Sequence, residues 1–256
     1  MKKVFIYIAA VLVIAGGSCK TVQQTAAINK DKLPEQFMVV LGVAQDAGYP
    51  QIGCEKECCT FYWQGKEKKK QVTSLALFDS QTRQYFLFEA TPDITQQLQM
   101  AQSYLGRDKW YAPDGIFLTH AHIGHYSGLM QLGREAIGAR SIPVWAMPGM
   151  KSFLETNGPW NQLVSLKNIQ LMPLKEDSAV QLNATLKVTP VKVPHRDEYS
   201  ETVGFIIQGP QKKVLFIPDI DKWEKWGRSI TEEIKKVDLA LLDGTFYDGT
   251  ELPGRD

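Results

Sequence analysis

The sequence has no excess of one charge, no long apolar run and little histidine. Basic and acidic residues nearly balance, leaving a formal charge of +1, so nothing in the composition indicates a nucleic acid or an acidic partner. The longest apolar run, Val4 to Ala15, is too short to span a bilayer comfortably. We find no internal repeat and no low-complexity segment. Histidine occurs only four times in 256 residues, which makes its distribution informative.

The N-terminal residues have the layout of an export signal. Two lysines follow Met1, the apolar run comes next, and small residues then lead to Cys19. Small residues before a cysteine resemble a bacterial lipobox, although Gly16 replaces the usual aliphatic residue. We expect a signal peptide over residues 1–18 and a lipid anchor on Cys19, so that the protein is exported and held at a membrane, facing the periplasm or the cell exterior. An ordinary cleaved signal and an uncleaved anchor remain alternatives.

The remainder of the chain is long enough for one sizeable α/β domain. Residues 20–36 are polar without a clear period and are typical of a tether. Residues 37–256 contain short apolar runs interleaved with helical patterns, which favours two β-sheets packed face to face with helices outside. The expected strands are residues 37–43, 74–78, 85–88, 116–118, 143–147, 169–174, 186–193, 202–208, 213–217 and 239–242.

Three of the four histidines lie together in the middle of the chain. The apolar run 116–118 leads directly to His120 and His122, and His125 follows at the start of a helix-like pattern. Neutral imidazole is the commonest protein ligand for zinc, and two histidines separated by one residue on a tight turn can reach the same cation. A polar strand-to-helix turn without a metal is the alternative. The clustering favours a metal site.

The pattern His-x-His-x-Gly-His resembles the His-x-His-x-Asp-His signature of the metallo-β-lactamase superfamily. The resemblance implies an α/β fold, an αββα sandwich of two mixed sheets with helices outside. Gly124 stands where the superfamily usually has an aspartate that binds a second metal and orients the attacking water. Glycine can do neither, so a normal two-zinc centre is not expected.

Later strand ends supply further candidate ligands. His195 and Asp219 each follow an expected strand, and strand ends are rigid supports for a metal site. The histidines His120, His122 and His195 would make a three-histidine zinc site with an open fourth position. The resemblance assigns the metal-bridging aspartate to Asp219 and an acidic residue one strand later to Asp243.

The resemblance also limits the expected number of metal ions. The superfamily uses a final histidine near the C-terminus, and none follows His195, so the domain is compatible with a C-terminally incomplete one. We therefore expect one tightly held zinc ion per chain, with a doubtful second site. His125 is then a hydrogen-bonding or proton-transferring group.

Within the superfamily, the chain most resembles the pyrroloquinoline-quinone biosynthesis protein B family. The similar motifs are residues 39–42, 48–51, 91–94, 216–219 and 243–246, together with a cysteine cluster. That family is cytoplasmic, whereas this chain begins like an exported protein. It also tends to lack the full histidine cluster. A shared fold does not carry over a reaction, so we expect a relative with its own substrate.

Three cysteines, Cys54, Cys58 and Cys59, lie in one expected loop. Related proteins carry a Cys-x-Cys-x-x-Cys cluster there that binds a structural zinc. The spacing in this chain can still supply three thiolates, with the fourth ligand unidentified. In an oxidising compartment, a disulfide from Cys54 to Cys58 or Cys59 competes with that interpretation.

These patterns favour a zinc hydrolase of the metallo-β-lactamase superfamily that acts on a small molecule. Zinc-bound hydroxide would attack an ester, lactam, lactone or phosphodiester bond. Asp219 would align the metal-bound water, and His125 or Asp243 would pass protons. Two alternatives remain open: an iron-dependent oxygenase of the same fold, and a surface lipoprotein that binds a ligand without catalysis. The sequence does not identify the substrate.

Overall fold

The computed structural model describes residues 33–105 and 109–246. The expected signal peptide, the lipidation site at Cys19 and most of the tether lie outside the described residues and stay predictions. Within those two ranges no helix combines the length and the apolar character needed to cross a membrane.

The first sheet has six strands in chain order. The first three strands pair antiparallel, and the later neighbours pair in parallel. The strands are β1 Gln36–Gly42, β2 Ser74–Asp79, β3 Gln84–Phe88, β4 Gly115–Phe117, β5 Ile142–Ala146 and β6 Ile169–Pro173.

The second sheet has five strands in the order β11-β10-β9-β8-β7. Its neighbours pair antiparallel except β10 and β11, which are parallel. The strands are β7 Val180–Gln181, β8 Lys187–Lys192, β9 Val203–Gln208, β10 Lys213–Ile217 and β11 Leu239–Leu242. Both sheets are therefore mixed.

Side-chain alternation along β2 shows why the sheets pack as layers. Leu75 and Leu77 belong to the cluster between the two sheets, where they meet residues such as Phe205. Ala76 and Phe78 point to the other face, into the cluster that the helices cover. Because successive strand side chains point to opposite faces, a strand that is apolar throughout is buried on both sides.

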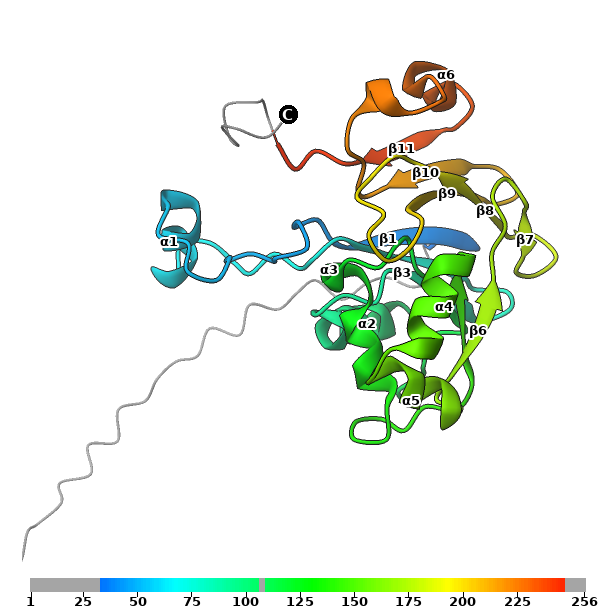
Figure 1. The fold of residues 1–256 in the computed structure, drawn as a ribbon, viewed down its shortest axis with the longest axis horizontal. Helices are drawn as coiled ribbons and strands as arrows, with labels where there is room; N and C mark the ends of the chain where they lie inside the picture. The colour runs from blue at the N-terminus through cyan, green and yellow to red at the C-terminus, as the bar shows by residue number, and fades with distance from the viewer. Residues whose placement is uncertain (1–32, 106–108, 247–256) are drawn as a thin grey trace, which may run out of the picture.

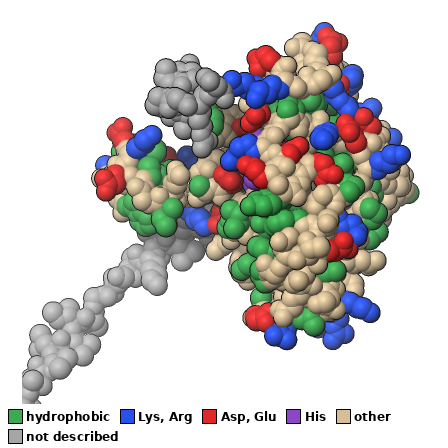
Figure 2. All heavy atoms as spheres, viewed as in Figure 1, with side chains coloured by type: hydrophobic (Ala, Val, Ile, Leu, Met, Phe, Trp, Pro, Cys, Tyr) green, Lys and Arg blue, Asp and Glu red, His purple; other side chains and the backbone are tan. Residues whose placement is uncertain are grey.

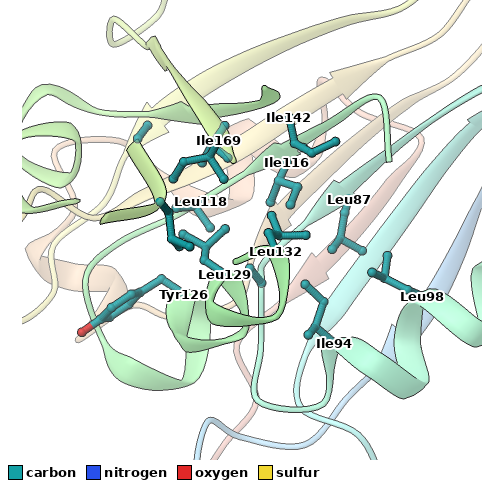
Figure 3. Close-up of a cluster of buried hydrophobic side chains, with 14 of the residues drawn as sticks. Leu87, Ile94, Leu98, Ile116, Leu118, Tyr126, Leu129, Leu132, Ile142 and Ile169 are labelled. Carbon is teal, nitrogen blue, oxygen red and sulfur yellow. The ribbon is translucent and has the colours of Figure 1, made fainter. Parts of the chain in front are cut away.

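The outer face of the first sheet is covered by helices. The core there contains Leu87, Ile116 and Leu129, which Figure 3 shows converging between sheet and helices. The covering elements are α2 Ile94–Leu105, the 3₁₀ helix η2 Ser127–Leu132, α4 Pro148–Thr156 and α5 Trp160–Ser165. A third cluster lies on the outer face of the second sheet, against η3 Trp223–Lys225 and α6 Ile230–Ile234. The layers are thus helix, sheet, sheet, helix, which confirms the expected αββα sandwich.

The strands expected from the sequence are confirmed, with ends that differ by a few residues, but three details were wrong or missing. Cys58 and Cys59 do not lie in a loop, because α1 Glu57–Trp63 carries both. The short α5 and β7 were not foreseen. In Figure 1, α1 stands apart from the sandwich at the end of the excursion between β1 and β2.

Candidate metal centre

Four potential ligands come from three strand ends and converge at one edge of the sandwich. His120 and His122 follow β4, His195 follows β8, and Asp219 follows β10. One donor atom from each of the four side chains lies within 4.8 Å of every other. The structure therefore brings together all four of the metal ligands expected from the sequence.

The distances define which atom of each side chain faces the centre. His122 Nδ1 lies 2.8 Å from His120 Nε2 and 3.2 Å from His195 Nε2. Asp219 Oδ2 lies 3.6 Å from the Nε2 atoms of both His120 and His195. Three nitrogen atoms and one oxygen atom thus face a common point.

These separations fit a zinc ion. Ligand bonds of about 2.0–2.1 Å in tetrahedral geometry place neighbouring donor atoms roughly 3.3 Å apart. Four of the six separations, from 2.8 to 3.6 Å, lie on either side of that value, and all six are within 4.8 Å. Imidazole nitrogen with carboxylate oxygen is also a ligand set that zinc accepts.

The second nitrogen of His120 and of His122 has a hydrogen-bond partner that fixes the ring. His120 Nδ1 lies 2.8 Å from the Thr119 hydroxyl, and His122 Nε2 lies 2.9 Å from Glu198 Oε2. His195 Nδ1 is 3.8 Å from Asp221 Oδ1. Such partners select the tautomer and orientation of metal-binding imidazoles. The sequence pattern did not predict any of these three residues.

Burial favours the neutral form of two of the ligand histidines, which is the form that binds a metal. Desolvation lowers the pKa of His120 well below its ordinary value, and it lowers the pKa of His195 as well. Burial alone would raise the pKa of Asp219, but the neighbouring histidines, His125 first, bring it below its ordinary value. Neutral imidazoles and an ionised carboxylate are the states that coordinate a cation.

His125 lies behind this group, between two carboxylates. Its Nδ1 is 3.3 Å from Glu89 Oε2, and its Nε2 is 3.3 Å from Asp219 Oδ2. Burial lowers the pKa of His125, but Asp219 and Glu89 outweigh burial and raise it to about 10. Burial in turn raises the pKa of Glu89. Each ring nitrogen of His125 thus lies 3.3 Å from a carboxylate oxygen, and its expected role as a hydrogen-bonding or proton-transferring group stays a prediction.

Glu89 is a site residue that the sequence analysis missed. It is fully buried and has a φ of 75°, a conformation that non-glycine residues rarely adopt. It directly follows β3, and an acidic residue at the end of an apolar strand was the signal that could have revealed it.

Asp243 lies near Asp219, but both of its carboxylate oxygens accept hydrogen bonds from neighbouring loop residues. Its Oδ2 accepts a hydrogen bond from the Ile220 amide at 3.2 Å. Its Oδ1 accepts hydrogen bonds from the amide and the hydroxyl of Thr245. These contacts support a role in positioning the residue after Asp219. The expected proton transfer by Asp243 stays a prediction.

A hollow of about 510 Å³ adjoins Asp219 between the two sheets. Its lining includes Gln45, Leu242 and Asp243. A larger hollow, about 650 Å³, lies elsewhere, along Phe37, Met38 and Lys212. Because the smaller hollow touches a metal ligand, it is the better space for a substrate. Little histidine surface is visible in Figure 2, and it lies beside acidic and basic side chains.

The cysteines form a second group, away from the histidines. All three are free thiols, their sulfur atoms lie within 4.8 Å of one another, and a hydrogen bond from Cys59 lowers the pKa of Cys54. Within the described residues, no fourth histidine, cysteine or carboxylate joins this group. The expected structural zinc and the competing disulfide both stay predictions.

Comparison with known proteins places this site in a family. Residues 84–254 match the family described as "Beta-lactamase superfamily domain". Coenzyme PQQ synthesis protein B of Methylorubrum populi is 27% identical over 234 residues, which cover 86% of this chain and 74% of that protein. The protein of the same name from Nitrosococcus oceani is 28% identical over 239 residues, covering 83% and 75% respectively.

Solved structures agree at the level of the fold. Zinc-bound PqqB from Methylobacterium extorquens superposes with a TM-score of 0.66 at 21% identity, over 81% of this chain and 72% of that one. A diphosphatase from the PhnP family gives a TM-score of 0.52 at 21% identity, over 73% and 67%. Both similarities concern the arrangement of the sandwich.

Proposed function

Because this chain belongs to the beta-lactamase superfamily, we propose that it is a zinc-dependent hydrolase of small molecules, with a centre formed by His120, His122, His195 and Asp219. The convergence of these four donors from three strand ends is the observation that carries the proposal. The bonds that suit such a centre are those of an ester, a lactam, a lactone or a phosphodiester.

Zinc supplies Lewis acidity and lowers the pKa of a bound water to about 7. The protein residues divide the remaining work. Asp219 accepts a hydrogen bond from the attacking water and balances the charge of the cation. His125 fixes the Asp219 carboxylate through their 3.3 Å contact. The hollow beside Asp219 receives the substrate.

The test pairs metal content with turnover. Purified wild type is assayed on esters, thioesters, lactams, lactones and phosphodiesters, and the same assays are run on His122→Ala. We expect the substitution to abolish zinc binding at the centre and turnover together, because it removes the donor closest to two others. Ile123→Ala is the matched control, since this neighbour is 66% exposed and supplies no ligand.

Turnover that survives complete metal removal would contradict the proposal. Failure on the whole panel with the metal intact would favour a binding protein instead. Three imidazoles and a carboxylate can also hold iron, so the metal content of protein produced without added zinc decides between hydrolase and oxygenase.

A further inference from the structure

Ser200 makes a hydrogen bond to the turn that carries two of the candidate zinc ligands. The backbone amide of Ala121, the residue between His120 and His122, donates to Ser200 Oγ at 2.9 Å. Both partners are buried, with exposed fractions of 5% for Ala121 and 7% for Ser200. A buried amide needs an acceptor, and the serine hydroxyl supplies it.

The hydroxyl of Ser200 is itself oriented by its surroundings. It donates a hydrogen bond to the Glu201 carbonyl oxygen at 3.1 Å, which leaves its lone pairs for the Ala121 amide. The Glu201 side chain accepts a hydrogen bond from the Gly149 amide at 2.9 Å, and this bond fixes the residue after Ser200 to the start of α4. Ser200 is therefore held in a position that receives the amide.

A second hydrogen bond joins the same two segments on the other side of His120. The amide of Val203, the first residue of β9, donates to the Thr119 carbonyl oxygen at 3.2 Å. Thr119 follows β4 of the first sheet, whereas β9 belongs to the second sheet. The residues before and after His120 are thus both bonded to the segment that leads into the second sheet.

That segment also carries the third histidine ligand. His195 and Ser200 lie in the same loop between β8 and β9. The loop is closed at its base by a hydrogen bond of 3.0 Å from the Val193 amide to the Thr202 carbonyl oxygen. A metal site works only when its ligands are held to within about 0.5 Å of the required geometry. The spacing between this loop and the turn 120–122 therefore sets the shape of the site.

We propose that Ser200 is a positioning residue of the zinc centre, which acts through the Ala121 amide to hold the turn 120–122 at the correct distance from His195. The inference rests on the proposed function, because it takes the three histidines as ligands of one ion. Ser200 acts on the backbone that carries two of these ligands, and its hydroxyl is the group that matters.

The experiment measures zinc affinity by competition with a chelator, on the full-length chain after metal removal. Ser200→Ala removes the acceptor and should weaken zinc binding at the histidine centre by about 10–100-fold, the range for loss of a group that orients a metal ligand. Ser200→Thr keeps a hydroxyl and should bind zinc more tightly than Ser200→Ala. His122→Ala removes a ligand, so its comparison with wild type separates this ion from any zinc held by the cysteines.

Ser229→Ala is the matched control. The Ser229 hydroxyl also accepts a hydrogen bond from a backbone amide, that of Glu232 at the start of α6, and α6 packs on the outer face of the second sheet. Loss of this helix cap should lower the temperature of thermal unfolding and leave zinc affinity unchanged. Ser200 lies in a loop, so loss of its hydroxyl leaves the hydrophobic clusters intact and the variant should fold.

Cobalt(II) in place of zinc separates a positioning role from a structural one. Its visible absorption depends on coordination geometry, so Ser200→Ala should change the cobalt spectrum and Ser229→Ala should not. Unchanged zinc affinity and an unchanged cobalt spectrum in Ser200→Ala would overturn the inference, and so would a folded Ser200→Thr that binds zinc no better than Ser200→Ala. Equal zinc binding by wild type and His122→Ala would instead overturn the proposed function, and the inference with it.

Discussion

At the scale of single residues, the metal centre depends on the polar groups that orient its imidazole rings. His122 presents Nδ1 to the centre because its Nε2 meets Glu198 Oε2 at 2.9 Å. The contact also lowers the pKa of Glu198, with His122 as the main cause. Glu198 follows three residues after His195 in the same loop, so this loop supplies one ligand and orients another.

Removing the charge of Glu198 should weaken metal binding without weakening the fold. Glu198→Gln loses the carboxylate that fixes His122, and we expect zinc affinity to fall by about 10–100-fold. The Glu198 side chain is 50% exposed, so thermal unfolding of the metal-free protein should stay within the small change typical of surface sites. Competition with a zinc chelator measures the affinity.

Glu176→Gln is the control for this substitution. The Glu176 side chain has a similar exposure of 47% and faces Arg228, away from the centre. If Glu198→Gln binds zinc as tightly as this control, Glu198 has no positioning role.

The ligands could be predicted from the sequence, but their supports could not. His120, His122 and His195 stand out because histidine is rare and each follows an apolar run. Glu198 lies in a loop, whose path follows no period.

At the scale of elements, apolar strands were predictable and short helices were not. Strand β2 is buried at every position. A short continuous apolar run of this kind indicates a buried strand even when the neighbouring strands are unknown. In α1, Cys59 is the only buried residue of the helix, so no apolar periodicity marks it.

The thiols of α1 and its preceding turn allow a direct prediction. Because the three sulfur atoms lie close together as free thiols, we expect them to bind zinc and remain unoxidised. Alkylation of denatured, unreduced protein, followed by peptide mapping, should label Cys54, Cys58 and Cys59 once the zinc is released.

The reduced and alkylated protein is the reference for complete labelling. A map with only one of the three cysteines labelled would show a disulfide and contradict the zinc site. A chelator present during denaturation ensures that bound metal does not protect the thiols.

At the scale of the whole molecule, the site results from how two sheets are stacked. β4 belongs to the first sheet, and β8 and β10 belong to the second. Their ends meet at one edge only because the cluster around Phe88, Phe117 and Phe205 locks the sheets face to face. Alternation and family resemblance predicted this sandwich, whereas the register that brings the four donors together required the structure.

The most direct test of the account is a zinc count after mild chelation, made on wild type and on His195→Ala. His195 reaches the centre from the second sheet. A loss of zinc in the His195→Ala variant would therefore show that ligands from both sheets hold the same ion. We predict that wild type retains one zinc ion per chain more than the variant, whatever the cysteines hold. Equal zinc retention by the two proteins would contradict the account.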